Sequence, residues 1–156
     1  MIQNITGSLE FLVGISFIAI LVWISWIDLK SRIIPNISVA ALLFLDMIQL
    51  ILHAIQGQSI WPAVFGLLIG LPFLPAWHLG KIGAGDIKLL IACGFFLGLP
   101  DGILMLGIVL ILSFIVALIC LFRKQPLHVQ IPFGPLISAS SAIVYFVIII
   151  FSIIII

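Results

Sequence analysis

Residues 102–122 read GILMLGIVLILSFIVALICLF, an apolar run without a single charged side chain. A helix needs about 20 such residues to cross the hydrocarbon core of a bilayer, so this run predicts a membrane-spanning helix. Comparable runs lie on both sides of it, separated by polar residues, glycines and prolines. The runs predict spans near residues 9–27, 37–55, 60–79, 86–99, 102–122 and 133–156.

The composition of the whole chain also indicates a membrane protein. Of 156 residues, 65% are hydrophobic and 7% are charged, and the mean hydropathy is +1.52. Soluble domains carry about 25% charged residues, so this chain cannot cover a water-facing surface. A net charge of +1 without a basic stripe excludes a nucleic-acid binder. We expect one all-α, polytopic membrane domain over residues 1–156, with six transmembrane helices.

The basic side chains predict the orientation of this bundle. All of them fall in segments that a six-span topology places on one side: after the first span, at the junction of the third and fourth, and after the fifth. By the positive-inside rule that side is cytoplasmic, which leaves both termini outside. The basic residues are Lys30, Arg32, Lys81, Lys88, Arg123 and Lys124. The segment Met1–Ser8 contains none, so we expect no cleaved secretory signal and a retained first span.

The fourth span is unusually short. From Asp86 to Leu99 a helix extends about 21 Å, against about 30 Å for the hydrocarbon core. Gly80, Gly83 and Gly85 precede it and give the backbone conformational freedom. We therefore expect this helix to begin below the cytoplasmic surface, inside the protein.

The positions of two of the five acidic residues have a simple structural explanation, and that of a third has two alternative explanations. Glu10 and Asp101 fall near predicted outer ends of spans, where water or headgroups can solvate them. Asp46 falls near the middle of the second span, with Gln49 and His53 along the same helical face. A carboxyl hydrogen-bonded to another helix would explain Asp46, and so would a path for protons or water.

The other two acidic residues, Asp28 and Asp86, fall at the same predicted cytoplasmic depth. Taken singly, Asp28 could anchor a helix end at the interface and Asp86 could cap the fourth helix. Two carboxyls held close together share one proton, so one can act as a base on water while the other acts as an acid. The pair therefore predicts peptide hydrolysis without a covalent nucleophile, a metal or an organic cofactor.

Three segments around these residues resemble the type IV prepilin peptidase family of GxGD membrane aspartyl proteases. They are residues 28–36 (DLKSRIIPN), 83–88 (GAGDIK) and 132–135 (PFGP). The resemblance implies an enzyme of a prokaryotic cytoplasmic (inner) membrane that serves type IV pilus or related secretion systems. It implies cleavage of a basic leader from prepilins or pseudopilins at the cytoplasmic face, before their hydrophobic helix, with Asp28 and Asp86 as the catalytic pair.

Larger members of that family carry an extra segment with paired CxxC cysteines and also N-methylate the product. This sequence has no CxxC pair, so it resembles the compact, peptidase-only members, such as those that serve tight-adherence pili. Methyl transfer is not expected, and no S-adenosylmethionine site is implied.

Other residues of the three motifs are expected to shape the site. The proline at residue 35 breaks the chain before the second helix, and the asparagine after it is expected to cap that helix. The glycines allow close approach of a substrate backbone. The lysines either tune the pair or anchor in headgroups, and the PFGP segment either closes the site or simply starts a helix. These residues are Lys30, Pro35, Asn36, Gly83, Gly85, Lys88, Pro132, Gly134 and Pro135.

A small proton-coupled transporter or channel is the alternative function. The polar face of Asp46, Gln49 and His53 motivates it, because transport sites lie near the bilayer midplane. Asp28 and Asp86 lie at one edge instead, and no inverted repeat is evident, which favours the peptidase. A catalytically silent scaffold of a secretion system would keep the fold but would not need both aspartates.

Overall fold

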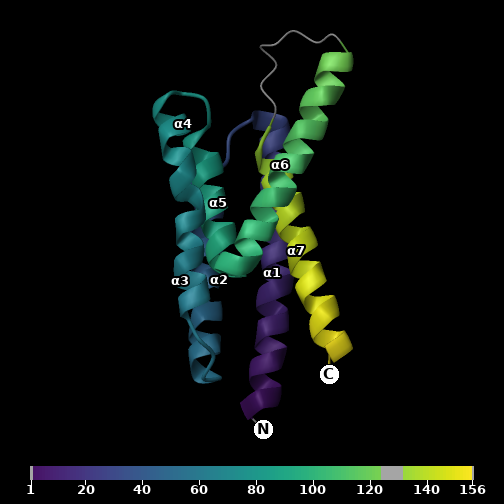
Figure 1. Ribbon diagram of the computed structural model, residues 1–156. Coiled ribbons are helices and arrows are strands. Elements are labelled where there is room, and N and C mark those ends of the chain that lie inside the picture. Colours follow the sequence, from purple (N-terminus) through teal and green to yellow (C-terminus); the bar gives the residue numbers. More distant parts are fainter. Residues whose placement is uncertain (1, 124–131, 156) are drawn as a thin grey trace.

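The computed structural model describes residues 2–123 and 132–155, and every regular element in this part of the chain is a helix (Figure 1). The all-α prediction is confirmed for these residues. Lys124, one of the six basic residues, lies outside them. The elements are α1 (Ile2–Ser31), α2 (Asn36–Ile55), α3 (Trp61–Gly66), the 3-10 helix η1 (Leu67–Phe73), α4 (Leu74–His78), α5 (Ala84–Leu97), α6 (Leu99–Phe122) and α7 (Gly134–Ile155).

Helices that are long and apolar enough to cross a membrane correspond to five of the six predicted spans. They are Thr6–Ser31, Asn36–Ile55, Trp61–His78, Leu99–Phe122 and Gly134–Phe151. The remaining predicted span, the short one at residues 86–99, corresponds to α5, a helix of 14 residues. The start of α1 and the end of α7 lie at the same end of the molecule (Figure 1).

The third predicted span is not one continuous α-helix. It is divided into α3, η1 and α4, with Pro72 inside the 3-10 segment and Pro75 in the first turn of α4. Proline lacks a backbone N–H and clashes with the preceding turn, so an α-helix cannot continue through both residues. The same segment packs closely on α5, because a Cβ atom on Gly66 would collide with the carbonyl oxygen of Gly94.

Helix α5 is the centre of the bundle. Nine of its 14 residues are buried, and it contacts α2, α3, η1, α6 and α7. By contrast, α6 buries only three of its 24 residues, which suits a helix that faces lipid. Phe96 of α5 stacks on Phe17 of α1 with ring centroids 3.7 Å apart, and Tyr145 of α7 meets both rings at an angle of 65°.

Helix α5 is shorter than the neighbouring helices because it ends early, at the end away from Asp86. Its first turn is level with the start of α2, because Lys88 Nζ donates a hydrogen bond of 2.9 Å to Asn36 Oδ1. At the other end, a turn at Gly98 with a φ of 81° leads directly into α6, and this turn lies about half-way along α1 (Figure 1). The first turn of α5 is therefore tied to the start of α2, and the helix is short because it ends at Gly98.

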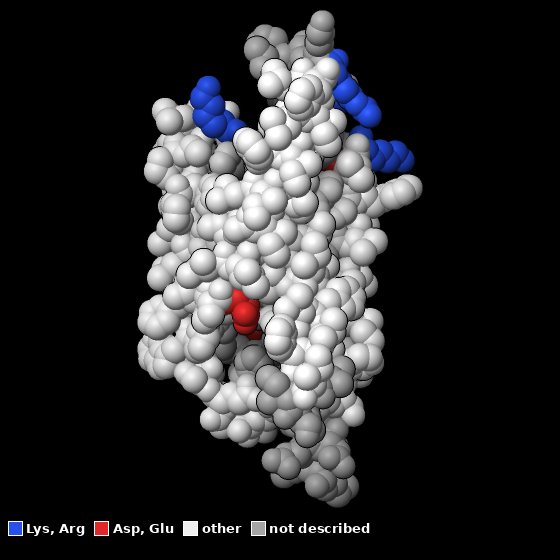
Figure 2. Space-filling model, turned by 45° about the vertical axis from the view of Figure 1, so that its right-hand side comes forward, with Lys and Arg blue, Asp and Glu red and all other residues white. Residues whose placement is uncertain are grey.

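One acidic residue outside the motifs differs from its predicted position. Asp101 lies in the first turn of α6, beside the half-way turn rather than at an outer end of the bundle. Glu10 lies near the start of the apolar part of α1, and its Oε1 accepts a hydrogen bond of 2.8 Å from Nε2 of Gln56, the C-cap residue of α2. Figure 2 shows basic side chains near one end of the molecular face in view and acidic atoms about half-way along it.

Candidate active site

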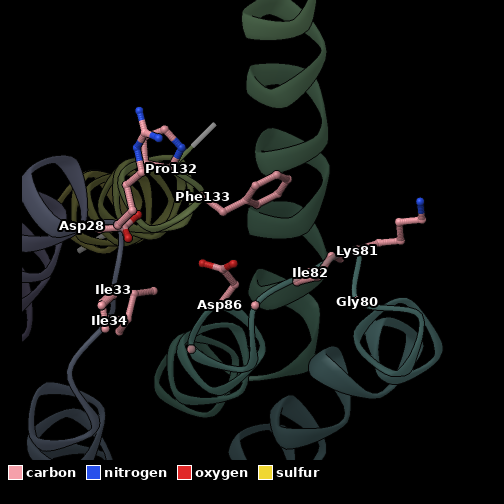
Figure 3. A pocket seen from close by; sticks show the side chains of 12 residues that line it. Asp28, Ile33, Ile34, Gly80, Lys81, Ile82, Asp86, Pro132 and Phe133 are labelled. Carbon is pink, nitrogen blue, oxygen red and sulfur yellow. The ribbon is translucent and has the colours of Figure 1, made fainter. Parts of the chain in front are cut away.

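A pocket of about 580 Å³ opens at the end of the bundle where α1 finishes and α5 begins (Figure 3). Four segments form it: the last turn of α1 and the residues after it, the loop before α5, the first turn of α5, and the residues before α7. Its lining consists of Asp28, Arg32, Ile33, Ile34, Gly80, Lys81, Ile82, Gly83, Gly85, Asp86, Pro132 and Phe133. The structure thus brings together residues from all three sequence motifs.

Asp28 lies in the last turn of α1 and is 4% exposed. Its Oδ2 accepts a hydrogen bond of 2.9 Å from the backbone N–H of Gly134, the first residue of α7. The N-terminus of a helix presents free N–H groups and a partial positive charge, so it suits a carboxylate. A Cβ atom on Gly134 would lie 2.7 Å from Asp28 Oδ2. The glycine of the PFGP segment therefore makes room for the carboxyl and also holds it.

Asp86 lies on the opposite side of the pocket, in the first turn of α5, and is half-buried. It is the third residue of the helix and not its N-cap, which is Gly83. The carboxyl instead turns back to make a hydrogen bond with the Gly83 backbone, as the third helical residue does in a capping box. A Cβ atom on Gly83 would lie 3.0 Å from Asp86 Oδ2, so this glycine also leaves room for a carboxyl.

The two carboxyls face the same hollow from opposite sides (Figure 3). Both belong to the lining of this one pocket. Two ionised carboxyls at one cavity repel each other, and one proton held between them removes that repulsion. The arrangement can hold one acid and one base beside the same substrate atom.

Apolar side chains form the walls of the pocket: Ile33 and Ile34 lie on one side of the space between the carboxyls, Phe133 lies on the other, and Ile82 lies beyond Asp86 (Figure 3). Ile34 packs against the first turn of α5, where a Cβ atom on Gly85 would lie 3.0 Å from Ile34 Cβ. Sequence reasoning did not select these four residues, although three of them lie inside the motif segments. Isoleucine and phenylalanine are the expected residues in any membrane helix, so their types carried no signal.

Several residues predicted to shape the site lie outside the pocket. Lys30 and Lys88 are exposed, and Lys88 is hydrogen-bonded to Asn36. The prediction that Asn36 caps α2 was wrong: Pro35 occupies the N-cap position with an extended backbone, and Asn36 makes no capping hydrogen bond. Pro135 lies in the first turn of α7, where proline is compatible with a helix. Lys30 and Lys88 lie on the two helices that carry the carboxyls, whereas Pro35, Asn36 and Pro135 lie at the starts of α2 and α7.

Two of the residues that line the pocket are basic, and sequence reasoning did not select either of them for the site. Arg32 directly follows α1 and has a φ of 54°, a left-handed conformation that glycine most often adopts. Its backbone N–H donates a hydrogen bond of 2.8 Å to the carbonyl oxygen of Asp28. The side chain of Lys81 points away from the carboxyls (Figure 3).

Asp46 lies apart from this pocket. It is 2% exposed, and neither of its carboxyl oxygens has a hydrogen-bond partner among the described residues. The predicted hydrogen bond to another helix is therefore not found there. Gln49 and His53 are half-buried on the same helix.

Comparisons with known proteins agree with the motifs. Residues 15–156 match the type IV leader peptidase family. The chain is 31% identical over 151 residues to the prepilin leader peptidase/N-methyltransferase of Bacillus subtilis (strain 168). This match covers 88% of the present chain and 56% of the Bacillus protein. It is 32% identical over 138 residues to the prepilin leader peptidase/N-methyltransferase of Xanthomonas campestris pv. campestris. This match covers 81% of the present chain and 46% of the Xanthomonas protein.

The chain therefore spans about half the length of these curated relatives. No solved structure matches it. The family match covers nearly the whole chain and includes all three motif segments, which confirms the resemblance read from them. This protein belongs to the type IV leader peptidase family.

Proposed function

We propose that this protein is a membrane aspartyl endopeptidase that removes the basic leader from type IV prepilin-like substrates, with Asp28 and Asp86 as its catalytic pair. One observation carries the proposal: these two carboxyls, 58 residues apart in sequence, line one pocket at one end of the bundle. Family membership supports the choice of a peptidase and of a prepilin-type substrate.

The chemistry needs only the two carboxyls and water. The ionised carboxyl takes a proton from water, and the oxygen of that water forms a bond to the carbon of the scissile peptide. The protonated carboxyl donates a hydrogen bond to the peptide oxygen and then gives its proton to the leaving amine as the C–N bond breaks. The pair regains its starting protonation when the two products depart.

The surroundings of the pair suit an extended, mainly apolar peptide. Ile33, Ile34, Ile82 and Phe133 line the pocket that holds the carboxyls. A glycine next to the scissile bond would occupy the least space in it. The pocket opens at the end that the basic residues predict to be cytoplasmic. A leader would enter from that side, while the hydrophobic helix of the substrate stays in the lipid beside the bundle.

The test is cleavage by the purified protein in detergent. A prepilin-type substrate with a basic leader is incubated with wild-type protein, and the mass of the product N-terminus is measured. We expect cleavage between the leader and the hydrophobic segment by wild type, none by Asp86→Asn, and wild-type cleavage by Asp101→Asn. The last variant makes the same chemical change at a carboxyl that does not line the pocket.

Each result has a definite meaning for the proposal. Cleavage by Asp86→Asn at the wild-type rate would exclude the catalytic pair. Loss of cleavage in Asp101→Asn would show that any aspartate substitution inactivates the protein, and the pair would lose its support. The same mass measurement reads N-methylation separately, as one added methyl group.

A further inference from the structure

The interior of the bundle holds polar groups that the peptidase chemistry does not use. Asp46 on α2 is 2% exposed, Ser38 on the same helix is 0% exposed, and Ser138 on α7 is 3% exposed. Neither Asp46 oxygen and neither serine hydroxyl has a hydrogen-bond partner among the described residues. A buried polar group without a partner is costly, so its presence at three places calls for a physical explanation.

Asp46 belongs to a polar layer in which four helices meet. Helices α2 and α5 pack together and begin at the same level, and Asp46 is the eleventh residue of α2 (Asn36–Ile55) while Cys93 is the tenth of α5 (Ala84–Leu97), so the two lie at similar depth. The Cys93 thiol interacts with the Ser141 hydroxyl on α7. The Ser141 hydroxyl also lies 3.0 Å from Met105 Sδ on α6 and donates a hydrogen bond of 2.8 Å to the carbonyl oxygen of Ile137. Cys93, Ser141 and Met105 are all 0% exposed.

This layer lies directly beneath the proposed catalytic pair. Cys93 follows Asp86 by seven residues on α5, which places it on the same helical face about 10 Å deeper. Ser141 follows Gly134 by the same interval on α7, and Ser138 lies one turn below Gly134. The unpartnered hydroxyl of Ser138 thus occupies the level between the Asp28 carboxyl, which Gly134 holds, and the layer of Asp46.

Water fits these groups better than a metal ion does. A carboxyl needs a donor and a serine hydroxyl can use either a donor or an acceptor, and a buried water supplies both. The sulfur atoms of Cys93 and Met105 are poor ligands for hard cations such as Na⁺ or Ca²⁺. Among residues 2–123 and 132–155, no group of three or more His, Cys, Asp or Glu side chains is placed to hold a metal.

We propose that Ser138, Ser38 and Asp46 bind a file of internal water molecules that supplies the hydrolytic water to Asp28 and Asp86. The inference rests on the proposed function of that pair. A substrate that fills the apolar pocket would separate the carboxyls from bulk water, so a store beneath them keeps the reaction supplied. Asp46 is then a positioning residue that acts through water and does not contact the substrate.

Radiolytic hydroxyl labelling tests the water directly. X-ray pulses generate hydroxyl radicals from bound water, and mass spectrometry then locates the oxidised side chains. Cys93 and Met105 are fully buried sulfur residues of the polar layer, so we expect labelling of both in the wild-type protein, while a bulky thiol reagent in solution leaves Cys93 unmodified. Asp46→Leu should lose labelling at both positions and keep it at Met47, which is 45% exposed on the outside of α2.

Cleavage kinetics test the supply of water to the pair. Asp46→Leu should lower kcat about tenfold, the equivalent of one well-ordered water, and leave KM unchanged. Asp46→Asn keeps a donor and an acceptor for water and should retain wild-type kcat. Ser138→Ala removes one hydroxyl and should lower both kcat and labelling.

The outcomes separate this inference from the proposed function. Absence of labelling at Cys93 and Met105 in the wild type would overturn the water file. Equal loss of kcat in Asp46→Asn and Asp46→Leu would also overturn it, since a water-binding role survives the amide. If the wild type cleaves no substrate, the proposed function fails, whereas the labelling pattern still decides whether the interior holds water.

Discussion

Replacing Gly134 by alanine places a methyl group against the Asp28 carboxyl. The added Cβ would lie 2.7 Å from Asp28 Oδ2 and 3.0 Å from its Cβ and Cγ atoms. Ordinary van der Waals contact begins near 3.4 Å, so the carboxyl or the start of α7 must move by about 0.7 Å. Asp28 is buried and α1 packs closely on α7, so the displacement falls mainly on the carboxyl and on its hydrogen bond to the Gly134 N–H.

The size of the effect follows from this displacement. A misplacement of about 1 Å at a reacting group can lower a rate about 100-fold. The hydrogen bond of a charged group contributes about 1.5–3 kcal/mol, which corresponds to a factor of about 10–150 in rate. We expect Gly134→Ala to lower kcat/KM about 30- to 100-fold. The free energy of unfolding should change by less than about 1 kcal/mol, because alanine favours the helix that begins there.

The assay is leader cleavage with the same substrate in the same detergent, together with a thermal melt. Gly107→Ala is the matched control: Gly107 is an exposed glycine of α6 with no neighbouring atom within 4 Å of an added Cβ. It should cleave at the wild-type rate. Equal kcat/KM values for the two variants would refute the role of Gly134 as the residue that holds Asp28.

Three further substitutions test the site and the packing around it. Gly83→Ala places a Cβ 3.0 Å from Asp86 Oδ2, a milder contact, so kcat/KM should fall about 3- to 10-fold in the cleavage assay. Gly66→Ala forces α3 away from the Gly94 carbonyl of α5 and should lower the free energy of unfolding by about 1–3 kcal/mol in a denaturant titration. Lys88→Met removes an exposed hydrogen bond and should change stability by less than about 1 kcal/mol and leave kcat unchanged.

Opposite results would contradict specific parts of the structure. Wild-type kcat/KM in Gly83→Ala would mean that the Asp86 carboxyl does not lie against residue 83. Wild-type stability in Gly66→Ala would mean that α3 and α5 do not cross at their glycines. Loss of kcat in Lys88→Met would restore Lys88 to the active site, as the motif alone suggested.

The long apolar spans could be predicted because their signal is strong and local. Runs such as residues 102–122 contain no charge and match the thickness of a bilayer, and the corresponding helix α6 has 24 residues. The division of the third span was missed although its prolines were visible. Pro72 and Pro75 were read as part of an apolar run, whereas a missing N–H at each of them prevents a continuous α-helix.

The two aspartates could be selected because acidic residues are so rare in this chain. The residues that contact the two aspartates could not be predicted in this way. The contact between Gly134 and Asp28 depends on how α7 approaches α1, and neither sequence segment contains that information. The same holds for Asn36, whose type suits an N-cap, but whose side chain accepts a hydrogen bond from Lys88 instead.

The walls of the pocket and the environment of Asp46 also depend on tertiary packing. Ile33, Ile82 and Phe133 look like any apolar residues of a membrane helix until the loops bring them beside the carboxyls. The sequence offered a hydrogen bond to another helix as the explanation for Asp46, and the described residues contain no such partner. Helical periodicity identifies the buried face of a helix, but it does not show which groups lie opposite.

The central claim is that Asp28 and Asp86 act as one catalytic unit, and a double-mutant cycle on single-turnover cleavage tests it most directly. The variants are Asp28→Asn, Asp86→Asn and the combination of both, measured with saturating substrate. Residues that act as a unit lose nearly all of their effect when either one is removed. We predict that all three variants fall to the same floor, about 1,000-fold or more below wild type. Near-wild-type cleavage by either single variant, or a double variant slower by the product of the two single losses, would contradict the account.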